Sequence, residues 1–199
     1  MKTPDRKAVS SRRDAILASA LGVTAGLITL NREAGASTPE AQENSNPAAR
    51  PRADDIMSVE SIIRALYDSI SGPPGTRDWD RLRGLFLPGA RLIPSGRRPD
   101  GSITARVLSV GDFIKAIEPR VKDEGFYESE IHRRVERFGA IAHVFSTYES
   151  RHAKDEKPFV RGINSIQLFF DAKRWWVVTI FWDSERPEQA IPDEYLPGK

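Results

Sequence analysis

The sequence contains no cysteine, which excludes disulfide bonds, thiolate nucleophiles, thiolate metal sites and lipid-modified cysteine anchors. Histidine is scarce as well, with only His132, His143 and His152. These three form no H-x-H or H-E-x-x-H motif, and no carboxylate cluster supplements them. We therefore expect no metal site and no cofactor.

A long hydrophobic run is also missing. The uncharged stretch 15–30 has sixteen residues rich in Ala, Gly and Thr, fewer than the ~20 apolar residues that a membrane-spanning helix needs. Basic residues, including the pair Arg12 and Arg13, precede this stretch, and Ala34-Gly35-Ala36 follows it. A basic head, a short apolar middle and a small-x-small exit are typical of a secretory signal.

The paired arginines resemble the twin-arginine export signal, whose receptor recognises an Arg-Arg pair just before a mildly apolar segment. We therefore predict a signal peptide over residues 1–36 with cleavage after Ala36, export through the twin-arginine machinery, and a periplasmic or secreted mature chain. After cleavage no stable membrane insertion is expected. An uncleaved N-terminal anchor and a general secretory signal are the alternatives.

Excess positive charge is absent from the expected mature chain. The whole sequence has 30 basic and 28 acidic residues, of which residues 1–36 hold six and three, so 24 against 25 remain, a net charge of −1. Nucleic-acid binding, which needs a basic excess, is therefore not expected. Residues 37–55 contain no large apolar side chain and predict a disordered linker. One domain is predicted over residues 56–197.

Three helices are expected at the start of this domain. Apolar residues recur at helical spacing over 59–70, and Gly72-Pro73-Pro74-Gly75 ends that helix. Asp78 is a candidate N-cap of a second helix that carries Trp79, Leu82 and Phe86 on one face and ends at Pro88-Gly89. A short strand is predicted over 90–94. Ser109 caps a third helix, with Asp112 as its capping-box partner.

The pattern changes to strands after Gly125. Two hairpins are predicted, one with its turn at Phe138-Gly139 and one with its turn at Ala172-Lys173. Strict alternation in the last strand places Trp176, Val178, Ile180 and Trp182 on one face, and Trp175, Val177, Thr179, Phe181 and Asp183 on the other. Both faces are then apolar, so we expect one to cover the helices or a pocket and the other to meet a second subunit in a homodimer. Helices followed by an antiparallel meander indicate an α+β fold.

Several stretches of this order resemble the nuclear transport factor 2-like superfamily, in particular its SnoaL-like and ketosteroid-isomerase-like branch. They are "ALYDSI", "RDWDRLRGLFLPGARL", "GAIAHVFSTYESR" and "RGINSIQLFFDAKRWWVVTIFWD". The resemblance covers nearly all of residues 56–183. It implies a cone-shaped, curved antiparallel sheet wrapped around about three N-terminal helices, an apolar pocket at the mouth of the cone, and homodimers.

Together with the predicted export signal, the resemblance implies an exported domain that binds a small, largely apolar organic molecule. Enzymes of this superfamily catalyse cofactor-free acid–base reactions, so an isomerase, dehydratase or cyclase is one function to expect. The alternative is a non-catalytic homodimerising or interaction module of the cell envelope. No family triplet of catalytic residues is matched here, so no catalytic role transfers from the resemblance.

Individual residues must therefore be weighed singly. His132 is a candidate general base because its ordinary pKa lies near neutral pH, and Asp80 is a candidate pocket carboxylate. A surface histidine between Glu130 and Arg134, and an acid favoured by a helix N-terminus, are the corresponding structural interpretations. Asn164 shares a strand face with Ile166 and Leu168 and is a candidate buried hydrogen-bonding group. The predicted ligand-pocket residues are Tyr67, Trp79, Phe86, Tyr148, Asn164 and Trp182.

Overall fold

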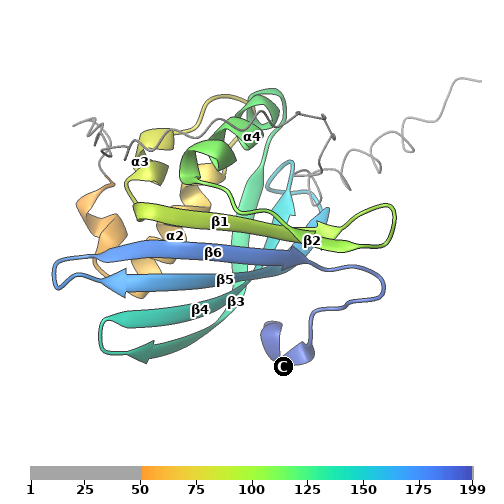
Figure 1. Ribbon diagram of the computed structural model, residues 1–199. Coiled ribbons are helices and arrows are strands. Elements are labelled where there is room, and N and C mark those ends of the chain that lie inside the picture. Colours follow the sequence, from red (N-terminus) through yellow and green to blue (C-terminus); the bar gives the residue numbers. More distant parts are fainter. Residues whose placement is uncertain (1–50, 199) are drawn as a thin grey trace, which may run out of the picture.

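The computed structural model describes residues 51–198, and Figure 1 shows helices gathered on one side of a curved sheet. The predicted signal, with Arg12, Arg13 and the cleavage site after Ala36, lies outside the described residues. No helix of the described part is both long and apolar enough to cross a membrane. The helices are η1 (Ala53–Ile56), α2 (Val59–Ile70), α3 (Trp79–Arg83), α4 (Val110–Asp123) and η2 (Asp193–Tyr195).

The first and third predicted helices are confirmed as α2 and α4. Ser58 caps α2 reciprocally with Ser61: each side-chain oxygen accepts from the other residue's backbone N–H, at 3.0 Å in both cases. At the start of α4, Ser109 Oγ accepts from the backbone N–H of Asp112 at 3.1 Å. These bonds satisfy backbone donors that the first turn of a helix cannot pair internally.

The second helix is shorter than the sequence pattern predicts. Asp78 does cap α3, accepting from the backbone N–H of Arg81 at 2.9 Å, but the helix ends at Arg83. Phe86 begins strand β1 instead of lying on the helix with Trp79, so that expectation is wrong. The predicted short strand at 90–94 is the middle of β1, whose pairing with β6 fixes the extended backbone.

The sheet has six strands in the order β2-β1-β6-β5-β4-β3. The β1 and β6 strands run parallel, and every other neighbouring pair in this sheet is antiparallel. The α+β class and the sheet wrapped around helices are confirmed, while the β1–β6 pair makes the sheet mixed. The strands are β1 (Phe86–Arg97), β2 (Ile103–Ala105), β3 (Tyr127–Phe138), β4 (Ile141–Arg151), β5 (Val160–Phe170) and β6 (Trp175–Ser184).

Both predicted hairpins are present, and the first turns one residue later than expected. Phe138 pairs with Ile141, so Gly139 and Ala140 form the turn. This register places His143 opposite Glu136, not opposite Arg134 as a turn at Phe138-Gly139 would require. The second hairpin turns through Ala172, which has a φ of 72°.

A β-bulge in β6 overturns the predicted division of its side chains between two faces. Gln167 pairs with Thr179 but Leu168 pairs with Val177, which leaves Val178 unpaired. The extra residue shifts the alternation, so the side facing the helices carries Trp175 and Val177 and then Ile180 and Trp182. The apolar residues thus follow one face through a bulge. They do not mark two equally apolar faces.

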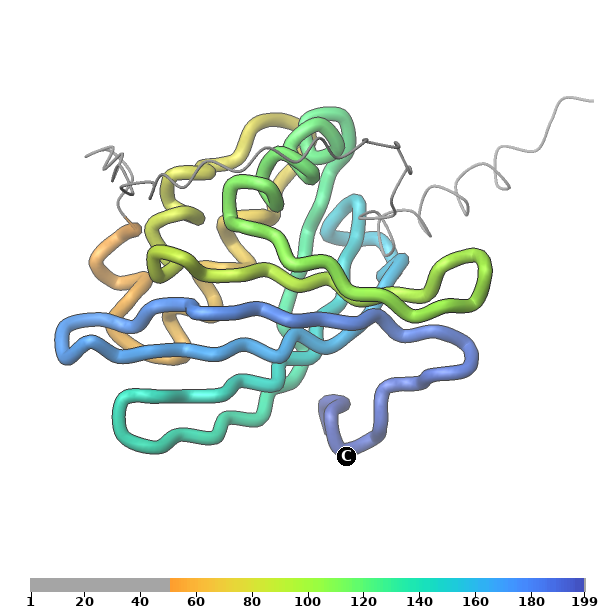
Figure 2. Tube along the Cα trace, in the orientation of Figure 1, coloured from red at the N-terminus to blue at the C-terminus, as the bar shows by residue number. Residues whose placement is uncertain are grey.

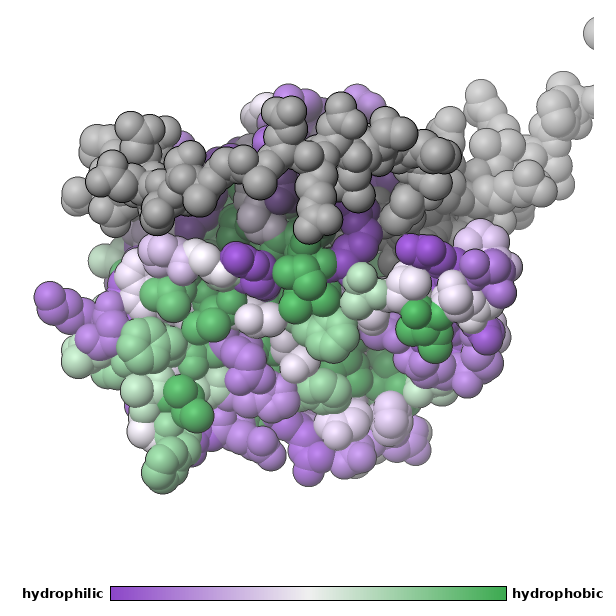
Figure 3. All heavy atoms as spheres, in the orientation of Figure 1, coloured by the Kyte–Doolittle hydropathy of each residue, from purple (hydrophilic) through white to green (hydrophobic). Residues whose placement is uncertain are grey.

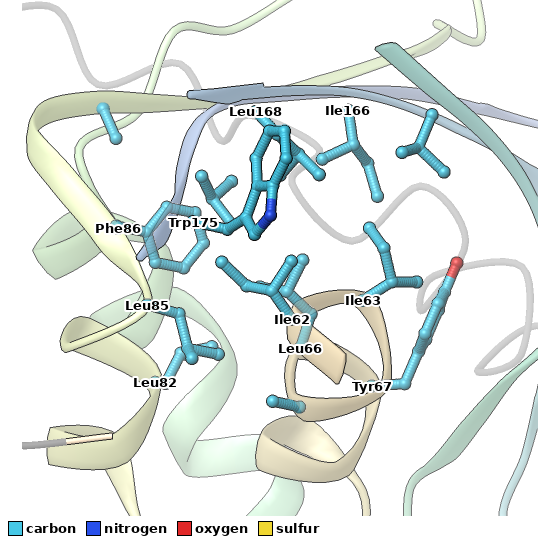
Figure 4. Close-up of a cluster of buried hydrophobic side chains, with 14 of the residues drawn as sticks. Ile62, Ile63, Leu66, Tyr67, Leu82, Leu85, Phe86, Ile166, Leu168 and Trp175 are labelled. Atoms are coloured by element: carbon cyan, nitrogen blue, oxygen red, sulfur yellow. The ribbon is translucent and has the colours of Figure 1, made fainter. Parts of the chain in front are cut away.

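The core lies between α2, α3 and the concave side of the sheet. Figure 4 shows Ile62, Ile63 and Leu66 of α2 pointing toward the strand residues Ile166 and Leu168. Tyr67 stands at the edge of this cluster with its hydroxyl pointing toward the sheet, where it lies 2.7 Å from Ser146 Oγ. Burying these side chains drives helix–sheet packing, at roughly 25 cal/mol per Å² of apolar surface.

The folded part begins slightly before the predicted boundary at residue 56. Asp55, expected in the linker, is buried and forms a two-fold hydrogen-bonded ion pair with Arg81 of α3, with both N–O distances 2.8 Å. At the other end the chain turns back under the sheet after β6 (Figure 2). There the Tyr195 ring lies 5.0 Å from that of Phe145, and Thr147 Oγ1 donates to the Tyr195 carbonyl at 2.7 Å.

Candidate functional site

A cavity of about 840 Å³ lies between the helices and the concave face of the sheet. Most of its wall is apolar and comes from every layer of the fold: Leu66 and Ile70 of α2, Phe86 and Leu92 of β1, Phe113 of α4, and Ile180 and Trp182 of β6. Its volume is in the range of sites that hold small organic molecules. The fold therefore provides an apolar container of useful size.

Polar side chains interrupt this apolar wall where β3, β4 and β5 run side by side. Glu128, Ser150 and Asn164 line the cavity from these three strands, together with Tyr67 of α2 and Tyr148 of β4. Ser150 Oγ donates to Glu128 Oε2 at 2.8 Å, and Asn164 also hydrogen-bonds to Glu128. Polar groups that converge in an apolar cavity can orient a ligand and act on it chemically.

A bulge in β3 directs Glu128 into the cavity. Glu130 pairs with Tyr148 and His132 pairs with Thr147, so Ile131 has no partner. Before the bulge, Glu128 and Glu130 face inward. After it, the inward alternation starts again at Arg133 and continues with every second residue. Bulges of this kind commonly re-aim side chains beside functional sites.

Glu128 is the one acidic residue among the described residues that line the cavity. Burial raises its pKa to about 7, against the opposing effect of hydrogen bonds from Ser150 and Asn164. No cation of the described chain pairs with it. At neutral pH both protonation states of Glu128 are therefore populated, as a general acid or base requires.

A second carboxylate, Glu130, has a different environment. It forms an ion pair with Arg133 and accepts a hydrogen bond from Ser146 Oγ at 2.6 Å. Because Ser146 donates to Glu130, it accepts from the Tyr67 hydroxyl, which is 2.7 Å away. Asn164 Nδ2 in turn donates to the Tyr67 hydroxyl at 3.1 Å. Each hydrogen bond in this series, from Asn164 of β5 through Tyr67 of α2 and Ser146 of β4 to Glu130 of β3, therefore has a defined donor and acceptor.

Tyr148 continues the polar row toward β6. Its hydroxyl lies 3.1 Å from Ser184 Oγ, and burial raises its pKa above the ordinary value. Gly162 of β5 makes this position possible: a Cβ there would stand 2.5 Å from the Tyr148 hydroxyl and 2.4 Å from the Asp183 carbonyl oxygen. Any residue larger than glycine at position 162 would therefore occupy the space that the Tyr148 hydroxyl takes.

The structure brings five of the six predicted pocket residues to the cavity wall. They are Tyr67, Phe86, Tyr148, Asn164 and Trp182. Trp79 lies elsewhere, where its Nε1–H donates to Glu118 of α4 at 3.2 Å. Asp80, the candidate carboxylate, is at the surface beside Arg83. These two residues do not contribute to the cavity wall.

The histidines also lie outside the cavity wall. His132 pairs with Thr147, whose side chain faces the C-terminal segment instead of the helices. His143 is hydrogen-bonded to Ser165, with Nε2 and Oγ 3.0 Å apart, and His152 stacks on Phe159. Among residues 51–198 no three histidine or carboxylate side chains gather closely enough to hold a metal ion.

Sequence reasoning missed Glu128, Ser150 and the Glu130–Ser146 link. One signal was available: Ser146, Tyr148 and Ser150 alternate along a strand and so form a row of hydroxyl groups on one face. An inward hydroxyl row needs partners, and Glu128 and Glu130 have the same two-residue spacing on the preceding strand. The bulge that aligns the two rows has no marker such as glycine in the sequence.

No protein-family model and no curated protein matches this chain. Similar solved structures include a protein of unknown function with a cystatin-like fold from Nostoc punctiforme. It is 8% identical in sequence, the match covers 66% of this chain and 96% of that chain, and the TM-score is 0.49. An NTF2-like protein of unknown function from Methylobacillus flagellatus has 11% identity, coverages of 65% and 96%, and a TM-score of 0.42. A candidate ketosteroid isomerase from Shewanella frigidimarina has 11% identity, coverages of 61% and 91%, and a TM-score of 0.41.

At these identities the similarity concerns the fold alone. Two of the three proteins are themselves of unknown function. The residues of the cavity must therefore carry any inference about activity.

Proposed function

We propose that this chain binds a small, largely apolar organic molecule in the cavity and exchanges a proton with it through Glu128, without a cofactor. The observation that carries the proposal is a carboxyl group with a pKa of about 7 on the wall of an apolar cavity, without a cation beside it. Isomerisation, dehydration and cyclisation all need such a group to take a proton from one atom and deliver it to another.

The surroundings of Glu128 support this role. The apolar wall strengthens its basicity by disfavouring the charged form, while Ser150 and Asn164 hold its orientation. Tyr67 and Tyr148 carry hydroxyl groups on the same wall. Burial raises both pKa values, so both hydroxyls stay protonated at neutral pH. The Tyr67 proton is donated to Ser146, which leaves Tyr148 as the tyrosine to interact with an oxygen atom of a ligand.

A general probe for a carboxylate base tests the proposal without knowledge of the substrate. In 5-nitrobenzisoxazole a base removes the proton on C3 while the N–O bond breaks, which yields a coloured cyanophenolate. We expect a rate that rises with pH around a midpoint near 7 and falls to the solvent background in Glu128→Gln. Glu156→Gln, at an exposed loop position, is the matched control. An equal rate in Glu128→Gln would refute the assignment.

We also propose that the chain is exported, on the support of its N-terminal sequence. Replacing both Arg12 and Arg13 with lysine keeps the charge but removes the arginine pair, so we expect the protein to remain in the cytoplasm. N-terminal sequencing of the exported wild-type chain should start at Ser37. Undiminished export of the double variant would contradict a twin-arginine route.

The alternative function, a homodimerising or interaction module, stays a prediction. The pattern that suggested it was the doubly apolar last strand, which the bulge at Val178 explains within one subunit. Exposed apolar side chains do remain, at the tip of the β3–β4 hairpin, where Phe138 is 85% and Ile141 59% exposed, and at Phe181 of β6. Figure 3 shows hydrophobic surface at this hairpin. Sedimentation of the mature chain would decide between a monomer and a dimer.

A further inference from the structure

The side-chain amide of Asn164 is held in one orientation by hydrogen bonds that begin at the ion pair of Glu130 and Arg133. The carboxylate of Glu130 has only acceptor oxygens, so the single hydroxyl proton of Ser146 goes to Glu130 Oε1 at 2.6 Å. The Tyr67 hydroxyl therefore donates to Ser146 Oγ and must accept from Asn164, 3.1 Å away. The amide nitrogen Nδ2 thus faces Tyr67, and the amide oxygen Oδ1 faces away from it.

This oxygen has no hydrogen-bond donor among the residues that the structure describes. The hydrogen bond of Asn164 to Glu128 lowers the pKa of that carboxyl, as a bond donated by the amide nitrogen does. Both bonds of the amide are therefore made by Nδ2. The one fully buried side-chain polar atom of the described chain that lacks a partner is Arg133 Nη1, so Oδ1 is not sealed within the protein. Asn164 is only 8% exposed and lines the cavity, so its free acceptor is presented to the cavity.

Apolar side chains lie on two sides of this acceptor. Trp182 of β6 pairs with Asn164, and Ile166 is the next inward residue of β5; both line the cavity. The Trp182 ring also packs edge-on against Phe113 of α4, with ring centroids 6.1 Å apart. A wholly apolar ligand on this wall would take Oδ1 out of water without replacing its hydrogen bond, which is unfavourable. A ligand that carries an O–H or N–H group avoids that loss.

We propose that Asn164 is a specificity-determining residue whose amide oxygen accepts a hydrogen bond from the ligand, so that the cavity selects apolar molecules bearing a hydroxyl or N–H group. The same amide is hydrogen-bonded to Glu128, so the donor group of the ligand is brought close to the carboxyl that exchanges the proton. This inference rests on the proposed function, since it names the class of molecule that the same cavity takes.

Two isomeric ligands test this selectivity directly. Octan-1-ol and 1-methoxyheptane have the same molecular formula, but the alcohol carries an O–H donor and the ether does not. Each competes with N-phenyl-1-naphthylamine, a neutral probe that fluoresces when it occupies an apolar cavity. Without an acceptor in the cavity the ether would displace the probe at least as well, because it has no donor to remove from water. We expect the alcohol to act at a concentration at least about fivefold lower.

The choice of pH separates Asn164 from Glu128. An amide does not titrate, so the preference for the alcohol should be the same at pH 5 and at pH 8. Glu128, whose pKa is raised to about 7 by burial, is mostly protonated at the lower pH and mostly charged at the higher. A preference that appears only at pH 8 would assign the acceptor to Glu128 and refute the inference.

Variants locate the preference at Asn164, and probe binding shows that each is folded. Asn164→Leu removes the acceptor, so we expect the two isomers to act at concentrations within about twofold of each other. Ser146→Ala leaves the cavity wall unchanged but removes the acceptor of the Tyr67 proton. Tyr67 then donates to Asn164, the amide turns its nitrogen toward the cavity, and the preference should be lost at pH 5 as well. Ser165→Ala, next to Asn164 on the outward side of β5, is the matched control and should keep the wild-type ratio.

The outcomes separate this inference from the function on which it rests. If both isomers displace the probe equally from the wild-type protein, or if either Asn164→Leu or Ser146→Ala keeps the preference, the inference is refuted and the binding cavity stands. If the probe does not bind and Glu128→Gln keeps the wild-type rate with 5-nitrobenzisoxazole, the proposed function fails as well. Loss of the preference in both variants, with Ser165→Ala unchanged, supports the inference, because only one of the two altered residues lines the cavity.

Discussion

Glu128 and Glu130 point to the same side of β3, but only Glu130 has an arginine beside it. Arg133 Nε donates to Glu130 Oε2 at 2.7 Å, whereas Glu128 accepts from the uncharged Ser150 hydroxyl at 2.8 Å. Glu130 thus has an ion-pair partner, whereas burial disfavours the charged form of Glu128. Two carboxylates two residues apart can thereby serve different purposes: one anchors a structural network, and the other is free to change its protonation state.

The first prediction concerns stability and pH. The pKa of Glu128 is raised in the folded state to about 7 from an ordinary value of 4.5, so its protonated form favours folding. This contribution is complete below pH 4.5 and is lost as the pH rises through 7. We expect Glu128→Gln to be more stable than wild type at pH 8, by on the order of 2 kcal/mol, and equal to it at pH 4.5. Urea unfolding at both pH values measures this, with Glu156→Gln as the exposed control.

The second prediction concerns the link between α2 and β5. Tyr67→Phe removes the acceptor of the Asn164 amide and the donor to Ser146, so buried polar groups lose partners. We expect a loss of roughly 1–3 kcal/mol in the free energy of unfolding. Asn164→Leu should cost a similar amount. In a double-mutant cycle the two changes should couple by at least about 0.5 kcal/mol; additive effects would contradict a shared network.

The third prediction concerns the buried ion pair near the start of the domain. Removing one partner of Asp55 and Arg81 leaves the other charge buried, so Arg81→Met should destabilise the protein by about 3–5 kcal/mol. Arg83→Met, which breaks the exposed pair with Asp80, should change stability by less than about 1 kcal/mol. Thermal unfolding of both variants makes the comparison, and equal effects would argue against the buried pair.

The pair also predicts a pH dependence. Arg81 lowers the pKa of Asp55 below 3.8, so the stabilisation is present above that pH and is lost as the pH falls through the folded-state value. In Arg81→Met this acid-sensitive part should disappear.

The fourth prediction concerns the close approach of Tyr148 to β5. Gly162→Ala would place a methyl group 2.4 Å from a backbone carbonyl oxygen and 2.5 Å from the Tyr148 hydroxyl, so the strand or the ring must move. We expect destabilisation of about 2 kcal/mol or more in urea unfolding. Binding of the neutral fluorescent probe N-phenyl-1-naphthylamine should also weaken, because Tyr148 lines the cavity. Gly96→Ala, where nothing lies within 4 Å of the added atom, should cost less than about 1 kcal/mol.

Local patterns predicted much of the fold. The spacing of apolar residues gave the bounds of α2, Ser109 marked the start of α4, and alternating residues around Gly139 and Ala172 indicated both hairpins. These features depend on contacts between residues near one another in sequence, which periodicity reports well. Asn164 was also placed correctly on the inward face, since its strand is regular up to Gln167.

Long-range pairing accounts for what the sequence did not reveal. The helical spacing of Trp79, Leu82 and Phe86 continues past the end of α3, but pairing of β1 with β6 holds Phe86 in a strand. Pro88 and Gly89 are accommodated by an irregularity in that pairing, between Phe86 and Arg91. The face of each β6 side chain depends on the unpaired Val178, and a bulge is decided by two strands together.

The unpaired Ile131 has a broader consequence. If the same residues paired regularly from the hairpin turn, alternation from Arg133 would bring Tyr127, Ser129 and Ile131 inward and turn both glutamates toward solvent. Whether this cavity is titratable or inert is therefore a property of backbone register. Homologues that keep every one of these residues but pair β3 with β4 in another register would differ in chemistry. A comparison of aligned residues alone would not separate them.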